Sequence, residues 1–207
     1  MISYEQRLSH SLDWALREGS MHFEKDSAVH KTLRKITHRL GELGIAYAIV
    51  DGMAMFFHGY RRFTEDVDLL VARADLDEIH RRLEGLGWVP LFQGSKHLRD
   101  VEYGVRVEFL TTGDFPGDGL PKPVAFPNPS EVSVEADGMR FLRLPTLIEL
   151  KLASGISNPR RAKDLVDVQQ LIETLSLAED FADQLNPYVQ DKFKELWAVV
   201  HDNPSEP

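Results

Sequence analysis

The sequence predicts an α/β (α+β) protein, with a mixed β-sheet flanked by helices and followed by a C-terminal helical bundle. Over the first 145 residues, segments with helical apolar spacing alternate with short strand-like segments, which is the pattern of an α/β arrangement. Helical spacing and capping residues dominate the remainder. We therefore expect three parts, which are an N-terminal helix over 1–25, an α/β domain over 26–145 and a helical region over 146–203.

Composition indicates a globular chain without thiol chemistry. The 207 residues are 43% hydrophobic, which suffices for a core, and they include no cysteine, which excludes disulfides and thiolate metal sites. There is no signal-peptide segment and no run of 18 apolar residues, so we expect a soluble cytoplasmic protein without a membrane partner. A net charge of −9 argues against bulk DNA or RNA binding but allows a local basic groove.

Apolar spacing and capping residues predict the helices of the first half. They are an amphipathic helix over 3–19, a helix that Asp26 or Ser27 caps and Gly41 and Gly44 end, and a helix from the capping box of Asp75 and Glu78 to Gly87.

Short apolar or alternating segments predict the strands. They are Ile45–Val50, the strand containing Asp66 and Asp68, Trp88–Phe92, Lys96–Tyr103, Val105–Leu110, and a hairpin of Val132–Ala136 and Met139–Leu142 with a type I′ turn at Asp137-Gly138. The segment Gly113–Glu131, rich in Pro and Gly, is expected to be a long irregular loop that either covers a substrate or only connects two elements.

Capping residues also mark the C-terminal helices. They are a helix from the capping box of Thr146 and Glu149, a helix that begins at Asn158-Pro159, and two last helices over 176–185 and 187–201.

Asp66 and Asp68 are the candidate metal ligands. Side chains alternate between the two faces of a strand, so these two carboxylates share one face while Val67 and Leu69 point into the core. Two close carboxylates repel each other and need a cation to stay ionised together, and Mg²⁺ (or Mn²⁺) prefers such oxygen ligands. The plain alternative is a pair of solvated acids on an exposed sheet face.

Two groups of residues form recognisable motifs. The first follows an apolar strand and comprises Gly52, Ala54, His58, Gly59, Thr64, Asp66 and Asp68, and the second comprises Lys151, Arg161, Lys163, Asp164 and Asp167. They resemble two signatures of the nucleotidyltransferase superfamily (DNA polymerase beta-like fold), and most closely of the small bacterial branch that contains abortive-infection toxins of the AbiEii type. The first signature is an apolar strand, a G-G-x-A turn, a short helix ending in H-G and a T-x-D-x-D strand, and the second is a lysine-bearing helix followed by R-x-K-D-x-x-D. Asp51 stands where the first glycine of the G-G pair usually lies.

The resemblance, which covers roughly residues 27 to 175, implies a metal-dependent transfer of a nucleoside monophosphate from an NTP to an acceptor hydroxyl. It implies a third carboxylate on a neighbouring strand, for which we favour Glu108 over Asp100 and Glu102 because Glu108 lies between two apolar residues. Asp66, Asp68 and Glu108 would then be the catalytic and metal-binding residues. The implied nucleotide-binding residues are Gly52, Arg62, Thr64, Lys151, Arg161, Lys163 and Asp164.

The acceptor is left open by the sequence, since family members modify tRNA ends, proteins or small molecules. Asp51 opens a further question, because a carboxylate beside the phosphates should repel a triphosphate unless a metal or a lysine neutralises it. One alternative is therefore a catalytically degenerate nucleotide-binding or partner-binding module of the same fold. Another is a toxin–antitoxin partner that contacts a cognate antitoxin through its C-terminal helices.

Overall fold

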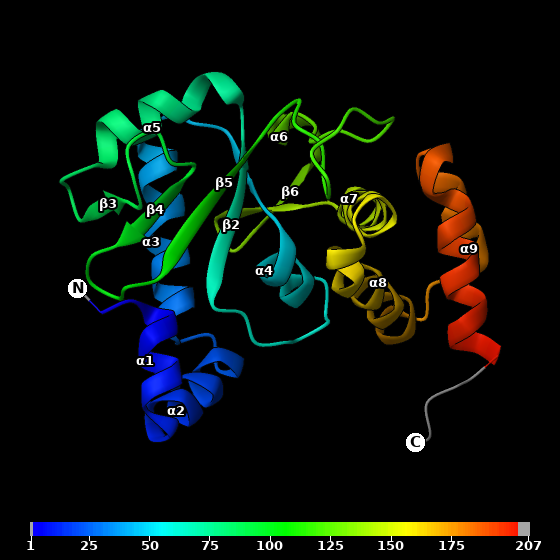
Figure 1. Ribbon diagram of the computed structural model, residues 1–207, viewed down its shortest axis with the longest axis horizontal. Coiled ribbons are helices and arrows are strands. Elements are labelled where there is room, and N and C mark those ends of the chain that lie inside the picture. Colours follow the sequence, from blue (N-terminus) through cyan, green and yellow to red (C-terminus); the bar gives the residue numbers. More distant parts are fainter. Residues whose placement is uncertain (1, 203–207) are drawn as a thin grey trace.

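The computed structural model describes residues 2–202, and a mixed β-sheet forms their centre (Figure 1). The strand order is β3-β4-β5-β2-β1-β7-β6, with β2 parallel to β5, β1 parallel to β7 and the other neighbours antiparallel. The strands are β1 (Tyr47–Ile49), β2 (Asp66–Val71), β3 (Trp88–Pro90), β4 (His97–Asp100), β5 (Arg106–Thr111), β6 (Ser133–Ala136) and β7 (Met139–Leu142). The predicted α+β class is confirmed.

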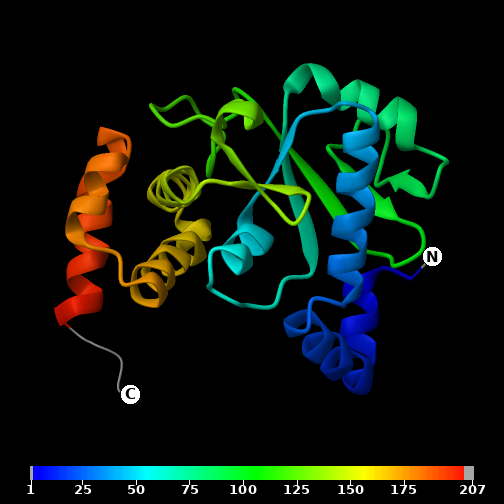
Figure 2. The same cartoon turned by 180° about the vertical axis from the view of Figure 1, so that it is seen from behind.

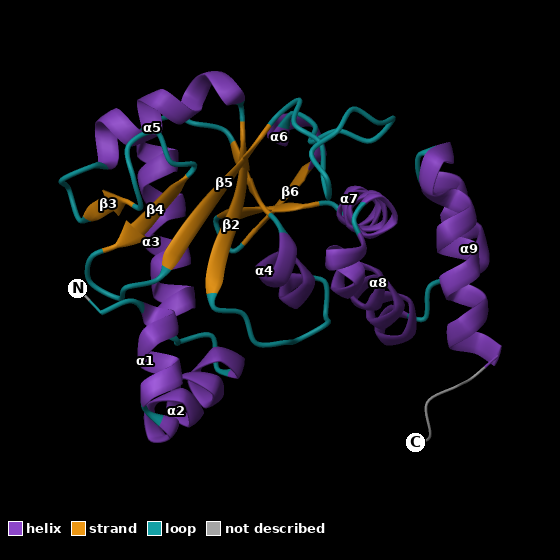
Figure 3. Ribbon diagram, viewed as in Figure 1, coloured by secondary structure: helices purple, strands orange, loops and turns teal. Residues whose placement is uncertain are grey.

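Helices cover the sheet and extend from it on one side, where α7, α8 and α9 pack together (Figure 3). The helices are α1 (Tyr4–His10), α2 (Leu12–Phe23), α3 (Ala28–Glu42), α4 (Asp51–Phe57), α5 (Leu76–Leu83), α6 (Pro129–Val132), α7 (Leu144–Ser157), α8 (Ala162–Leu175) and α9 (Pro187–Asp202). Within residues 2–202, the 3₁₀ turn η1 (Arg73–Asp75) links β2 to α5, η2 (Pro159–Arg161) links α7 to α8, and η3 (Glu179–Gln184) links α8 to α9. No helix within residues 2–202 is both long enough and apolar enough to cross a bilayer.

Strand alternation divides the apolar residues between two cores. Val67, Leu69 and Phe109 point toward α3 and α5, which lie against the face seen in Figure 2. Leu70 points the other way and packs with residues of α7, α8 and α9. The side chains of Asp66 and Asp68 lie on this second face, so the acids of β2 face the C-terminal helices.

The N-terminal segment differs from the prediction of one helix over 3–19. The chain breaks at Ser11, which has extended backbone and accepts a hydrogen bond from the backbone N–H of Trp14, so it caps a second helix. Leu12, which would lie on the apolar face of a single helix with Leu8 and Ala15, is consequently 74% exposed, while Tyr4 is fully buried. The apolar spacing in this segment was therefore a poor guide to burial.

Two predicted capping boxes are absent. Asp75 makes no capping hydrogen bond and belongs to the turn η1, and α5 ends at Leu83 rather than near Gly87. Helix α7 begins two residues before Thr146, and Glu149 accepts a hydrogen bond from the backbone N–H of Asn186 at 2.5 Å. The Glu149 carboxylate, which the sequence pattern predicts to cap its own helix, therefore binds a backbone N–H 37 positions away.

Other local predictions are confirmed. Asp137 and Gly138 have φ of 51° and 72° and form the tight turn between β6 and β7. The Asn158 side chain caps the turn η2, and the Asn186 side chain accepts from the N–H of Tyr188 at 3.0 Å.

The prediction of a helix over 176–185 is wrong. Ser176 ends α8 in a left-handed conformation, and the 3₁₀ turn η3 follows.

Candidate active site

The parallel pairing of β2 with β5 brings three acidic residues together. The register places Asp66 beside Arg106 and Asp68 directly beside Glu108, on the sheet face turned toward α7. Neighbouring residues in a paired register project to the same face, so the carboxylates of Asp68 and Glu108 are adjacent. Asp100, a competitor for the third position, is instead fully buried on β4, where Thr32 and Lys35 donate hydrogen bonds to it.

The two acids of β2 have different surroundings. Asp66 accepts hydrogen bonds from the Thr64 hydroxyl at 3.0 Å and from the Arg106 guanidinium at 2.6 Å. The Asp68 carboxylate makes no hydrogen bond or ion pair with any residue between 2 and 202. Burial raises the pKa of Asp68 well above its ordinary value, and the nearby charges of Asp66, Asp51 and Glu108 raise it further. A cation at this point would therefore replace a proton.

A tight backbone turn holds the start of α4 against this acidic strand. Asp51 adopts a left-handed conformation with φ of 45°, which Asp tolerates better than most residues and which explains the glycine implied here by the family resemblance. Gly52 follows, and a Cβ on Gly52 would lie 2.9 Å from the Cβ of Thr64. The absence of a side chain at Gly52 thus lets α4 approach the residue that orients Asp66.

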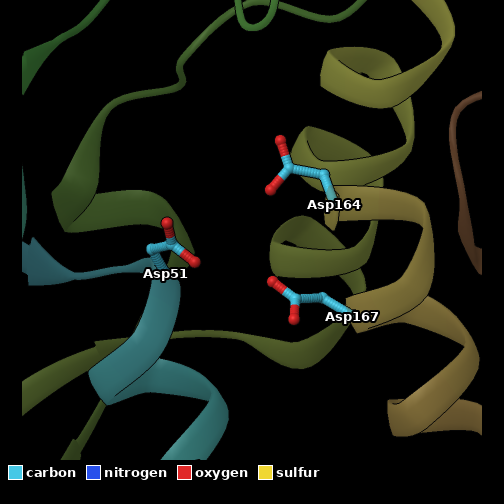
Figure 4. Close-up of side chains that lie close together, drawn as sticks. All are labelled: Asp51, Asp164 and Asp167. Carbon is cyan, nitrogen blue, oxygen red and sulfur yellow. The ribbon is translucent and has the colours of Figure 1, made fainter. Parts of the chain in front are cut away.

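Lys151 lies at the centre of a second acidic cluster, formed by Asp51 of α4 and by Asp164 and Asp167 of α8. The three carboxylates face one another across the gap between the two helices (Figure 4). The Lys151 Nζ lies 2.6 Å from Asp51, 3.2 Å from Asp164 and 2.7 Å from Asp167. Arg62 adds a second cation, at 3.1 Å from Asp51 and 3.3 Å from Asp167.

This pairing shifts the pKa values of Lys151 and Asp51. Burial alone would lower the pKa of Lys151, but the three carboxylates outweigh burial and raise it. Burial alone would raise the pKa of Asp51, whereas Lys151 and Arg62 lower it. Although one oxygen from each acid falls within 4.8 Å of the others, which is close enough for a metal, the ammonium of Lys151 already occupies the centre. The carboxylate of Asp51 is therefore neutralised by a lysine.

The other predicted nucleotide-binding residues have unequal access. Asp164 is buried and accepts hydrogen bonds from Ser154 at 2.6 Å and from Arg161 at 2.9 Å. The side chain of Arg161 is 50% exposed, so its guanidinium keeps a solvent-facing side. Lys163 is exposed and forms no ion pair within the part of the chain that the structure describes.

A cavity of about 260 Å³ opens beside Glu108. Its roof is the 112–128 segment, which is fixed to α7 because Asn158 donates to the Gly117 carbonyl at 3.2 Å and Ser157 donates to the Pro116 carbonyl at 3.4 Å. The lining is mainly apolar, with charged groups at one side, and comprises Val50, Asp51, Glu108, Leu110, Phe115, Pro116, Gly117, Phe126, Leu142, Leu147, Leu150, Lys151, Ser154, Arg161 and Asp164.

Sequence reasoning missed two partners of the acidic residues, Arg106 and His97. Arg106 lies two positions before Glu108 and therefore on the same strand face, which is a signal that β alternation could have supplied. His97 becomes a neighbour of Glu108 only through the pairing of β4 with β5, which the sequence does not specify.

Neither a protein-family model nor a curated protein matches the sequence. Solved structures do match. The crystal structure of ANT(2'')-Ia in complex with adenylyl-2''-tobramycin superposes with a TM-score of 0.53 and 15% identity, covering 81% of this chain and 98% of that chain. An antigenic nucleotidyltransferase-like protein from Paracoccidioides brasiliensis superposes with a TM-score of 0.50 and 15% identity, covering 84% and 88%. The protein therefore has the fold of the nucleotidyltransferase superfamily.

Proposed function

We propose that the protein is a metal-dependent nucleotidyltransferase that moves a nucleoside monophosphate from an NTP to an acceptor hydroxyl. The observation that carries the proposal is the Asp68 carboxylate, which has no partner among the described residues although Asp66 and Glu108 stand beside it. An unpaired carboxylate beside two others is costly unless a cation binds there. Three oxygen donors on two paired strands suit Mg²⁺ or Mn²⁺.

Each acid has a proposed role set by its position. Asp66 and Asp68 would hold the ion that accompanies the triphosphate, and Glu108 would share a second ion with them on the acceptor side. Divalent ions held by these residues would supply electrostatic stabilisation to the entering and leaving oxygens of the transfer. Thr64 orients Asp66 through its 3.0 Å hydrogen bond, and Gly52 gives the α4 turn room to approach it.

The basic residues divide into two groups. Lys151 and Arg62 are engaged with Asp51, Asp164 and Asp167, so we assign them to holding α4 against α8 beside the phosphates. Arg161 retains a solvent-facing guanidinium at the edge of the cavity, and we propose that it offsets charge on the phosphoryl group in transfer.

The cavity beside Glu108 is the proposed acceptor side, because Glu108 lines it whereas Asp66 and Asp68 do not. Its leucine and phenylalanine lining and its internally paired charges favour a compact, uncharged acceptor group over a polycation. The similar ANT(2'')-Ia is solved with an adenylylated antibiotic, so small hydroxyl compounds are the first acceptors to test.

The test is transfer of label from [α-³²P]NTP in the presence of Mg²⁺, with pyrophosphate release as a second readout. Asp68→Asn should abolish both signals, whereas Asp77→Asn, at an exposed position on α5, should retain them. Unchanged transfer by the Asp68 variant would contradict the assignment. A toxin role predicts, in addition, that expression arrests growth and that Asp68→Asn relieves the arrest.

A second candidate is a nucleotide-binding module without transferase activity. The contact that favours it is the 2.6 Å ion pair of Arg106 with Asp66, because a guanidinium on a metal ligand competes with the metal. This function predicts measurable ATP or GTP affinity without pyrophosphate release, and Arg106→Gln would then leave turnover at zero.

A further inference from the structure

His97 lies against Glu108, the one of the three proposed metal-binding carboxylates that lines the cavity. The antiparallel register of β4 and β5 places His97 opposite Glu108, and the imidazole Nε2 lies 3.1 Å from the Glu108 Oε2. The strands are held together on both sides of this contact, by the pairing of Leu98 with Val107 and by the 2.8 Å hydrogen bond from the Phe109 N–H to the Lys96 carbonyl. The contact therefore belongs to the sheet and not to a mobile surface loop.

Ser95 contacts the other ring nitrogen of His97. Ser95 is only 1% exposed, and its Oγ accepts a hydrogen bond from the backbone N–H of His97 at 3.0 Å. The same Oγ lies 3.2 Å from the His97 Nδ1. With an acceptor site of Oγ already in use, the hydroxyl hydrogen is free to point at Nδ1. The neutral tautomer that satisfies all these contacts carries its hydrogen on Nε2. This N–H donates a hydrogen bond to the Glu108 carboxylate.

Glu108 gains most from such a contact because its side chain has more rotatable bonds than an aspartate. Ordering a glutamate on a sheet surface costs rotamer entropy, and a carboxylate left to rotate would spend little time facing Asp68. A hydrogen bond to Oε2 fixes the carboxylate and leaves Oε1, which has no partner among the described residues, available to a cation.

We propose that His97 is a positioning residue: the Ser95–His97 pair fixes the Glu108 carboxylate in the orientation needed at the acceptor side of the cation site. The inference rests on the proposed nucleotidyl transfer. It assigns no proton transfer to His97, which acts through Glu108 and touches neither substrate.

Three variants test the inference. His97→Leu removes the donor, His97→Gln keeps an N–H donor near the position of Nε2, and Ser95→Ala frees the ring. His38→Leu is the matched control, because His38 also contacts a glutamate, at 3.2 Å from Glu42, on the exposed face of α3 and far along the chain from β5. Circular dichroism confirms that each variant is folded.

Three readouts are expected to agree. In ¹⁵N-histidine NMR spectra, His97 should be the Nε2–H tautomer, and Ser95→Ala should lose that signature. In an electron paramagnetic resonance titration with Mn²⁺, His97→Leu should weaken binding roughly 10-fold or more, as is usual when a ligand loses its orienting partner. Turnover should fall by a similar factor with little change in the KM for NTP, and His97→Gln should recover most of both losses.

The inference and the proposed function fail in different ways. If the wild-type protein turns over NTP and His97→Leu retains its Mn²⁺ affinity and kcat, or if His97→Gln is as impaired as His97→Leu, the positioning role is wrong and the transferase stands. If the wild-type protein binds no Mn²⁺, both are wrong. Adding His97→Leu to Glu108→Gln should cause no further loss, and an additive loss would overturn the role through Glu108.

Discussion

At the level of single residues, Lys151 determines whether the α4 and α8 acids can coexist. Its side chain is 5% exposed and forms ion pairs with three carboxylates. Without Lys151, each of these carboxylates would lose one cationic partner. A buried charge that has lost its partner costs much more free energy than a buried charge in an ion pair. The lysine that resembles a phosphate ligand in the sequence is thus, in the folded protein, first the counter-ion of Asp51.

We predict that Lys151→Met lowers the free energy of unfolding by about 3–5 kcal/mol, the usual cost of removing one partner of a buried ion pair. Urea denaturation measures the change. Lys163→Met, at an exposed position of α8, serves as the control and should stay within about 0.5 kcal/mol of the wild type. Equal stability of the two variants would mean that the Lys151 contacts contribute little.

Asp68 illustrates the opposite case, a residue whose ionised form is unfavourable in the fold. Because its pKa is raised in the folded state, the carboxylate lowers stability once the pH rises above its ordinary value. We predict that Asp68→Asn abolishes nucleotidyl transfer and increases the free energy of unfolding at pH 7 by about 0.5–2 kcal/mol, the range of typical stabilising substitutions. A destabilised Asp68→Asn protein would show that the carboxylate has a structural role.

At the level of elements, the 112–128 segment is a pinned roof whose attachment depends on Gly117. A Cβ on Gly117 would lie 2.6 Å from the Ser154 carbonyl oxygen on α7, so backbone meets backbone at this point. Gly119 has a similar conformation, with φ of 74° against 81° for Gly117, but a Cβ there would meet nothing within 4 Å. An alanine at either position therefore introduces backbone strain, but only an alanine at position 117 also collides with α7.

We predict that Gly117→Ala detaches the segment, so that hydrogen exchange accelerates over residues 113–126 and the KM for the acceptor rises severalfold. Gly119→Ala carries the same conformational cost and should leave exchange in the cavity roof near wild type. Equal exchange in the two variants would place the attachment elsewhere. Mass spectrometry of deuterated peptides resolves the segment.

At the level of the whole molecule, two buried histidines connect the N-terminal helices to the α/β domain. The rings of His22 on α2 and His30 on α3 are in tilted contact, with centroids 4.8 Å apart, and both lie against Phe56 of α4. His22 Nε2 also lies 3.1 Å from the Arg62 carbonyl, in the segment that leads to the acidic strand. Protonation of this pair therefore affects several elements at once.

We predict a loss of stability as the pH falls from about 6.5 toward 4. Burial, with the neighbouring His22, lowers the pKa of His30 from 6.5 to about 4. Within that window the unfolded chain binds the proton and the folded chain does not, so acid favours unfolding, by up to about 3 kcal/mol. His30→Leu should flatten the slope of unfolding free energy between pH 5 and 6.5, whereas His38→Leu should retain it. An unchanged slope in the His30 variant would show that other groups dominate the window.

The α+β class, the tight turn at Asp137-Gly138 and the caps at Asn158 and Asn186 could be predicted from the sequence, because each depends on residues close together in the chain. The break at Ser11 and the absent capping boxes could not, because Leu12 could have been buried on local spacing alone and Glu149 has its partner 37 positions away. Propensity is a weak prior wherever tertiary contact competes with it.

By itself, the sequence determined that Asp66 and Asp68 share one face of a strand, because side chains alternate along any strand, whatever surrounds it. Only the tertiary structure decided the partners of those acids. It placed Glu108 beside Asp68, set His97 against Glu108 and put Lys151 among the acids of α4 and α8. The physical reason is range, since strand alternation is a property of adjacent residues, whereas contacts across 11 to 100 positions depend on how the sheet and helices pack on one another.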